Sequence, residues 1–181
     1  MNALNLAEIG LLKALQGLIG CAPLDRLFGI LTTLGEGGAL WIALALVLLI
    51  IPRTRHIGCS MVLAMALCYL GGNLVLKNLI ARPRPFQVDP SIRLVIPPPR
   101  EYSFPSGHTM NGFAAASALW HERRRAGALA LALAALIAFT RLYFCVHYPT
   151  DVLGGIVIGC ASGRLFSRIV NAFAERRAAH V

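Results

Sequence analysis

The stretch PSGHTMNGFAAASALW, residues 105–120, joins a polar beginning to a run of small apolar residues. Proline is favourable at the first position of a helix, so Pro105 predicts a helix start. The small residues Ala114–Ala118 predict that this helix packs closely against a neighbour in a membrane. Ionisable residues are costly at such a place, so His108 indicates a functional site. The stretch therefore predicts both a central helix of the fold and the position of a candidate site.

The composition of the whole chain is that of a membrane protein. Hydrophobic residues make up 57% of the 181 residues, charged residues only 14%, and the mean hydropathy is +0.67. A soluble globular protein has about 25% charged residues. The net charge of +9 is typical of basic residues that flank membrane spans. The chain lacks the aromatic and basic interleaving of a nucleic-acid-binding module, so we expect a lipid bilayer and no nucleic acid as partner.

The apolar segments predict an all-α integral-membrane helical bundle formed by one domain, residues 1–181. Residues 3–20 have helical periodicity with polar residues on one side, which favours an N-terminal interfacial amphipathic helix within residues 1–22 over a weak first span. Five transmembrane helices follow, or six if the N-terminal helix also crosses. Their predicted ranges are 39–50 (after a shorter apolar piece and a glycine-rich break at 35–38), 57–80, 105–120, 126–145 and 149–170.

The connections between these spans predict the orientation. Residues 81–104 carry six prolines, and an irregular loop of this length is usually functional. The arginine-rich turn at 123–125, and the absence of Lys or Arg before Lys13, favour an external N-terminus. The 81–104 loop then also faces outward. We therefore expect a protein of the bacterial cytoplasmic membrane with its active site on the periplasmic face; the oligomeric state stays open.

Three polar groups lie near the ends of the predicted spans. They are KNLIARPRP (77–85), PSGH (105–108) and TRLYFCVHYPTD (140–151). Alternation of the spans places all three at one end of the bundle. Arginine forks suit phosphate oxygens, and the free N–H groups at a helix start can face an anion. Together the three groups predict a cradle for a phosphoryl group.

The two histidines of these groups can carry phosphoryl transfer. One imidazole can attack phosphorus and form a phosphohistidine, and the other can protonate the leaving oxygen. Asp151 lies four residues after His147, where a carboxylate could fix the imidazole tautomer. His108 has no nearby carboxylate in the sequence, which favours it as the acid. The chain offers no carboxylate pair and no His/Cys cluster, so we expect neither a metal nor a cofactor.

These motifs resemble the type 2 phosphatidic acid phosphatase family. The family pattern K-x6-R-P matches Lys77, Arg84 and Pro85, and P-S-G-H matches residues 105–108. The third pattern, S-R-x5-H-x3-D, matches Arg141, His147 and Asp151, with Thr140 in place of serine. The resemblance implies His147 as the nucleophile, Asp151 as its partner and His108 as the general acid. It also implies phosphate-binding residues, which are Lys77, Arg84, Ser106, Gly107 and Arg141.

The family also includes soluble acid phosphatases and vanadium haloperoxidases, and the hydrophobicity of this chain indicates the integral-membrane lipid phosphatases, which usually have six spans. We expect a phosphatase that acts on the terminal phosphate of a lipid such as phosphatidate, phosphatidylglycerophosphate, undecaprenyl diphosphate or lipid A. The alternative is a lipid transporter or flippase that guides an anionic headgroup. A transport path would spread its charges across the bilayer, whereas here they gather at one end.

Four further residues have two interpretations each. Arg82 is either solvated in the loop or a second phosphate contact. Glu101 and Tyr102 either line a headgroup site or have a plain loop role. Glu36, in the glycine-rich break, is either interfacial or in contact with substrate.

Overall fold

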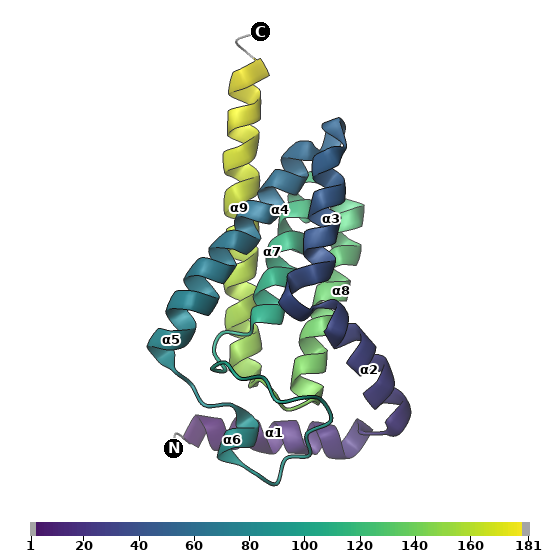
Figure 1. Ribbon diagram of the computed structural model, residues 1–181, viewed down its shortest axis with the longest axis vertical. Coiled ribbons are helices and arrows are strands. Elements are labelled where there is room, and N and C mark those ends of the chain that lie inside the picture. The colour runs from purple at the N-terminus through teal and green to yellow at the C-terminus, as the bar shows by residue number, and fades with distance from the viewer. Residues whose placement is uncertain (1–2, 179–181) are drawn as a thin grey trace.

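The computed structural model describes residues 3–178, which form helices and no strand. This part of the chain confirms the predicted all-α fold. The elements, labelled in Figure 1, are α1 (Ala3–Ile19), α2 (Ala22–Leu34), η1 (Glu36–Gly38), α3 (Ala39–Ile50), η2 (Pro52–Thr54), α4 (Arg55–Leu67), the π-helical η3 (Cys68–Leu76), α5 (Lys77–Ile80), α6 (Pro85–Val88), α7 (Gly107–Glu122), α8 (Arg124–Tyr143) and α9 (Pro149–Ala178).

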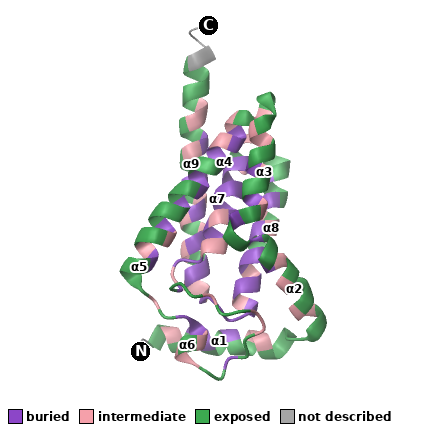
Figure 2. Ribbon diagram, viewed as in Figure 1, coloured by how far each residue is buried: buried purple, intermediate pink, exposed green. Residues whose placement is uncertain are grey.

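Helix α7 is the centre of the bundle, with α3, α4, α8 and α9 around it (Figure 1). Its alanines at 114–116 and Ala118 are fully buried, as is Met110. Figure 2 shows this buried centre inside an exposed outer surface. Large apolar side chains lie on that outer surface, and Leu79 and Leu129 are 77% and 75% exposed. Apolar side chains exposed over the whole outside of a bundle suit contact with lipid.

The glycines of α9 make a close helix–helix contact with α7, whose small residues predicted such packing. A Cβ atom at Gly159 would lie 2.6 Å from the Met110 carbonyl oxygen, and one at Gly163 would lie 2.5 Å from that of Ala114. Backbones can approach this closely only where side chains are absent. The small residues of α7 and α9 therefore set the distance between the two helices.

We expect Gly159→Ala to destabilise the bundle by roughly 1–3 kcal/mol, since the added methyl group meets backbone that cannot rotate away. The thermal midpoint of the detergent-solubilised protein should fall by several degrees. Gly17→Ala is the matched control, because a Cβ atom at Gly17 on α1 would meet nothing within 4 Å. An unchanged midpoint for Gly159→Ala would contradict the proposed contact.

Three helical segments of the described residues are long and apolar enough to cross a membrane: Pro52–Val88, Arg124–Tyr143 and Pro149–Arg176. A fourth span results if α2 and the helix after it, bent by 42° at the glycine-rich break, are counted as one. Helix α7 has 16 residues, about 24 Å of helix, and is shorter than the hydrocarbon layer of about 30 Å. The prediction of five or six spans is therefore not confirmed.

The N-terminal helix forms as expected and lies across one end of the bundle, beside α6 and the loop that surrounds it (Figure 1). Its polar side faces the protein: Lys13 pairs with Asp89, and Gln16 donates to the Arg93 carbonyl. Its leucines at 11 and 18 are 64% and 83% exposed. The loop 81–104 is not wholly irregular, because Pro85 begins the short α6 and Gln87 caps it through the Arg84 N–H.

Candidate active site

A pocket of about 380 Å³ opens at the end of the bundle where α1 lies. The structure brings eight of the predicted site residues to its wall, from six parts of the chain. They are Glu36, Lys77, Arg84, Glu101, Gly107, His108, Arg141 and His147. Three cations and two imidazoles around one pocket can bind a phosphoryl group and transfer it.

Arg84 is held almost entirely by backbone oxygens. Its Nε donates to the Glu101 carbonyl at 2.6 Å, and its Nη1 donates to the Val146 carbonyl at 2.8 Å. The same Nη1 lies 3.2 Å from His147 Nε2, and only 2% of the residue is exposed. The guanidinium is therefore fixed against the imidazole at the wall of the pocket.

The other two cations are held by side chains. Lys77 Nζ donates to Glu101 Oε2 at 2.5 Å, and this hydrogen bond, with the charge of Lys77, holds the pKa of the Glu101 carboxyl below its usual value. Arg141 Nη1 donates to Thr32 Oγ1 on α2. Each cation therefore lines the pocket while one of its N–H groups donates to a neighbouring side-chain oxygen.

His147 reaches the pocket because α8 ends at Tyr143, between Arg141 and His147. Cys145 follows with a positive φ of 53°, and the chain turns before Pro149 begins α9. Along a continuous helix the two residues would face opposite sides. The helix end therefore lets one short segment supply both a cation and an imidazole.

Asp151 lies behind His147, in the first turn of α9, and is fully buried. Its Oδ2 is 3.4 Å from His147 Nδ1, an ion-pair distance longer than a well-formed hydrogen bond. Oδ2 also accepts from Ser103 Oγ at 2.5 Å and from the Tyr148 N–H at 2.9 Å. With Nδ1 facing the carboxylate, Nε2 is the ring nitrogen that faces the pocket.

Arg82, one of the predicted headgroup contacts, does not line the pocket. Its guanidinium lies over the ring of Tyr148 at 3.8 Å. It pairs with Asp151 and with Glu8 of α1. These contacts place Arg82 on the side of Asp151 that faces away from the pocket.

The PSGH segment differs from expectation in its first two residues. Helix α7 begins at Gly107, with Ser106 as its N-cap, so Pro105 is not the first helical residue. The Ser106 N–H donates to the Asp151 carbonyl, and its hydroxyl accepts from Thr109. The Ser106 N–H is therefore not free to face an anion, whereas Gly107 and His108 do line the pocket.

Tyr102, a predicted headgroup contact, and Thr140, which replaces the family's serine, do not line the pocket. Tyr102 is 44% exposed, and only its backbone takes part, because its carbonyl accepts from Arg84 Nη2 at 3.3 Å. The Thr140 hydroxyl, at the family's serine position, donates to the Ile137 carbonyl of its own helix.

Sequence reasoning missed two asparagines of the pocket wall, Asn73 and Asn111. Both side-chain oxygens are buried and, within the part of the chain that the structure describes, have no hydrogen-bond partner. The same holds for Arg141 Nε. A polar side chain inside an apolar span was the signal that could have revealed the asparagines.

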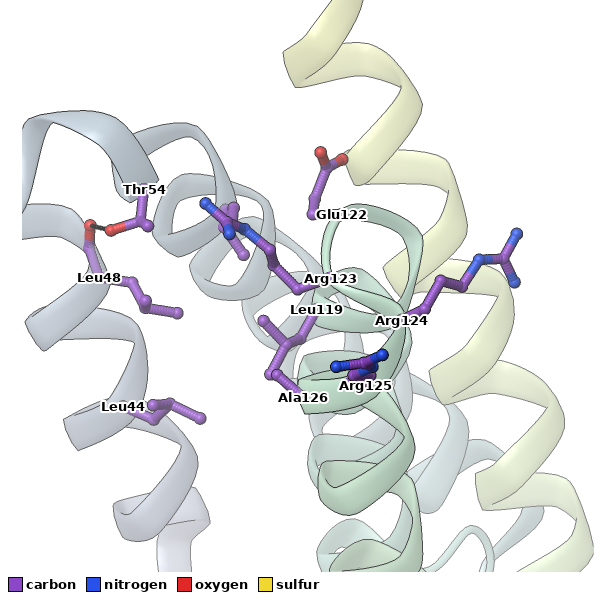
Figure 3. A pocket seen from close by; sticks show the side chains of 10 residues that line it. Leu44, Leu48, Thr54, Leu119, Glu122, Arg123, Arg124, Arg125 and Ala126 are labelled. Atoms are coloured by element: carbon purple, nitrogen blue, oxygen red, sulfur yellow. Dashed lines mark hydrogen bonds between the residues drawn. The ribbon is translucent and has the colours of Figure 1, made fainter.

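A larger hollow of about 640 Å³ lies at the opposite end of the bundle. Figure 3 shows its wall, with Leu44 and Leu48 facing the arginine turn 123–125. It contains none of the predicted site residues and has no histidine in its wall. The charges there suit the contact of a bundle end with anionic headgroups.

Comparisons with known proteins agree with the motifs. The family model described as PAP2 superfamily matches residues 57–175. An undecaprenyl-diphosphatase of Sulfolobus acidocaldarius is 32% identical over 155 residues, which cover 84% of this chain and 75% of the relative. A decaprenylphosphoryl-5-phosphoribose phosphatase of Mycobacterium tuberculosis is 31% identical over 144 residues, which cover 77% of this chain and 76% of the relative.

Two solved structures have the same fold. The crystal structure of Aquifex aeolicus LpxE superposes with a TM-score of 0.77 and 28% identity, covering 88% of this chain and 93% of that one. A PAP2-type phosphatidylglycerolphosphate phosphatase from Bacillus subtilis gives a TM-score of 0.75 and 27% identity, with 97% and 88% coverage. The chain therefore belongs to the PAP2 superfamily, as its three motifs predicted, and to the lipid phosphatase branch that its hydrophobicity indicated.

Proposed function

We propose that this protein hydrolyses the terminal phosphate of a membrane lipid phosphate or diphosphate through a phosphohistidine intermediate, without a metal. The observation that carries the proposal is the His147 ring, whose Nδ1 faces Asp151 while its Nε2 faces a pocket lined by three cations. An imidazole oriented by a carboxylate is a nucleophile, and cations around it stabilise charge that develops on phosphoryl oxygens.

The proposed reaction has two steps. His147 Nε2 attacks phosphorus, the bond from phosphorus to the leaving oxygen breaks, and His108 gives that oxygen a proton. Water then attacks the phosphohistidine, His108 takes a proton from the water, and the P–N bond breaks to release inorganic phosphate. Lys77, Arg84 and Arg141 bind the phosphoryl oxygens throughout, together with the backbone at Gly107.

A lipid substrate is supported by an apolar groove that continues from the pocket. This groove, of about 350 Å³, lies between α3 and α4 and shares Gly37, Gly38, Tyr69 and Asn111 with the pocket wall. Its remaining lining is apolar and includes Leu46 and Met65. A lipid can thus place its phosphate among the cations while its chain stays against apolar side chains.

The test is a phosphate-release assay on purified protein in detergent with a chelator present. The panel consists of phosphatidate, phosphatidylglycerophosphate, a polyprenyl diphosphate and a lipid A phosphate, because the relatives act by name on prenyl and other lipid phosphates. We expect turnover of at least one lipid in chelator. No release from any of them would overturn the proposal.

The alternative is a lipid transporter or flippase, which requires transfer of lipid across vesicles without release of phosphate. The site residues lie at one end of the bundle rather than along it, which favours hydrolysis. Transfer in proteoliposomes that survives loss of His108 would support the alternative.

The proposal includes the orientation. The chain would act as one membrane-embedded domain of the bacterial cytoplasmic membrane, with the pocket at the periplasmic face, because the arginine turn 123–125 lies at the opposite end of the bundle and such clusters favour the cytoplasm. A membrane-impermeant thiol reagent would test this on intact cells, because Cys21 is exposed near α1.

We expect Glu101→Gln to tighten the binding of inorganic phosphate by roughly two- to fivefold, because the carboxylate that now occupies Lys77 is an exposed competitor of the phosphate. Phosphate should therefore be a stronger product inhibitor of the variant. Asp89→Asn is the control, since Asp89 pairs with Lys13 outside the pocket. Weaker inhibition of Glu101→Gln would show instead that Glu101 helps to bind the substrate.

A further inference from the structure

Three charged side chains from distant parts of the chain meet at the beginning of α9. Arg82 donates through Nη1 to Asp151 Oδ1 at 2.5 Å and through Nη2 to Glu8 Oε2 at 2.6 Å. The side chains of Arg82, Glu8 and Asp151 are 12%, 5% and 0% exposed. We propose that Glu8 and Arg82 are positioning residues for His147 and Asp151, so that α1 is part of the catalytic apparatus; this rests on the function proposed above.

Arg82 fixes the direction of the Asp151 carboxylate. It holds Oδ1, which leaves Oδ2 toward the His147 ring. The guanidinium is itself fixed on several sides, because it lies over Tyr148 and donates to Thr150 Oγ1 and to Asn5 Oδ1, each at 2.7 Å. A carboxylate gripped by a fixed guanidinium cannot rotate away from the imidazole.

Glu8 restores the charge that Arg82 removes. Arg82 and Asp151 alone would form a neutral pair, and a neutral pair does little for a positive imidazole. With Glu8 included, the two carboxylates and one guanidinium carry a net charge of −1. In a buried place this charge stabilises the cationic ring that forms when His147 bonds to phosphorus.

Glu8 also joins α1 to the helix that carries Asp151. Its Oε1 accepts from the backbone N–H of Thr150 at 2.7 Å, in the first turn of α9, where such N–H groups have no partner within the helix. Ile9 and Leu12, beside it on α1, pack against Tyr148 and Cys145. The polar and apolar contacts of α1 thus converge on the segment around His147.

Two charge-removing variants should move the titration of His147 in opposite directions. Glu8→Gln keeps the shape and an acceptor but removes a negative charge, so the pKa of His147 should fall. Arg82→Gln removes a positive charge, so the pKa of His147 should rise. The other charged or titratable groups around the pair stay unchanged in both variants; they are Lys77 from α5, Arg84 and Glu101 from the loop, His108 from α7, Arg141 from α8, and Tyr148.

The experiment records imidazole NMR signals of the detergent-solubilised protein against pH, with His147→Asn to assign the signal, and measures kcat and KM. Each variant should lose kcat by on the order of 10²-fold, as expected of a small misplacement, with KM nearly unchanged because neither residue touches the phosphate. Lys13→Gln is the matched control on α1, since Lys13 binds Asp89 and Ser91 instead; it should behave as the wild type.

Shifts of equal sign, no shift, or the same loss in Lys13→Gln would overturn the proposal. If a single variant does not fold, the double variant Glu8→Gln/Arg82→Gln removes the Glu8–Arg82 pair together and keeps the charge of Asp151. It should fold with a low kcat and an unchanged KM, and wild-type kcat in it would also overturn the proposal. Wild-type protein that releases no phosphate from any lipid contradicts the proposed function instead, while the NMR titration still tests the link from Glu8 to His147.

Discussion

Replacement of His147 with asparagine is expected to lower kcat by at least about 10³-fold, because the proposed reaction has no path that avoids the bond between Nε2 and phosphorus. Asparagine can keep a contact with Arg84, so the pocket should retain its charge and substrate binding. KM should therefore change little. The measurement is phosphate release from the best lipid of the panel, with thermal unfolding to show that the variant is folded.

The same variant should abolish the covalent intermediate. Wild-type protein mixed with a labelled substrate and quenched in alkali should carry acid-labile phosphate, whereas His147→Asn should carry none. Asp151→Asn is the informative companion, since it keeps the nucleophile and removes only its carboxylate partner. We expect roughly 10²- to 10⁴-fold slower turnover with some phosphoenzyme still formed. Label on His147→Asn would assign the nucleophile to another residue.

The motifs predicted which residues meet, because spacing along alternating helices decides at which end of a bundle each one lies. Lys77, His108 and His147 line one pocket for that reason. The alternation of spans does not determine where each helix begins and ends. The number of spans is therefore unconfirmed, and α7 starts two residues later than Pro105 predicts.

Contacts between distant polar side chains could not be predicted from the sequence. Arg82 belongs to the same segment as Arg84, and both look equally suited to phosphate. Only the packing of α1 shows that Arg82 meets two carboxylates behind the pocket while Arg84 faces His147. Nothing in the sequence around Glu8 indicates a buried ion pair, since a single glutamate on an amphipathic helix is ordinarily solvated.

The second large effect concerns His108, on the first turn of α7 at the pocket wall. We expect His108→Asn to slow hydrolysis of an alkyl phosphate ester by roughly 10²- to 10⁴-fold, the usual contribution of a general acid. For a lipid diphosphate, the rate of the first step should fall less, because the leaving group is a phosphate. A phosphate is a much weaker base than an alkoxide. The ratio of the rate decrease for the alkyl ester to that for the diphosphate thus measures how much departure of the leaving oxygen depends on protonation.

An activated aryl phosphate separates the two steps of the reaction. Its leaving group needs no proton, so His108→Asn should form the phosphohistidine at nearly the wild-type rate. The second step still needs a base to activate water, and it should be slow. The variant should therefore release one equivalent of the aryl alcohol in a burst and then stop, with phosphate bound to His147. Equal losses in the rate of the first step for all three leaving groups would contradict a role as the acid, because a residue that only shapes the pocket has no reason to distinguish them. A burst with the aryl ester and none with the alkyl ester would assign both proton transfers to the His108 imidazole, at the beginning of α7 beside Gly35.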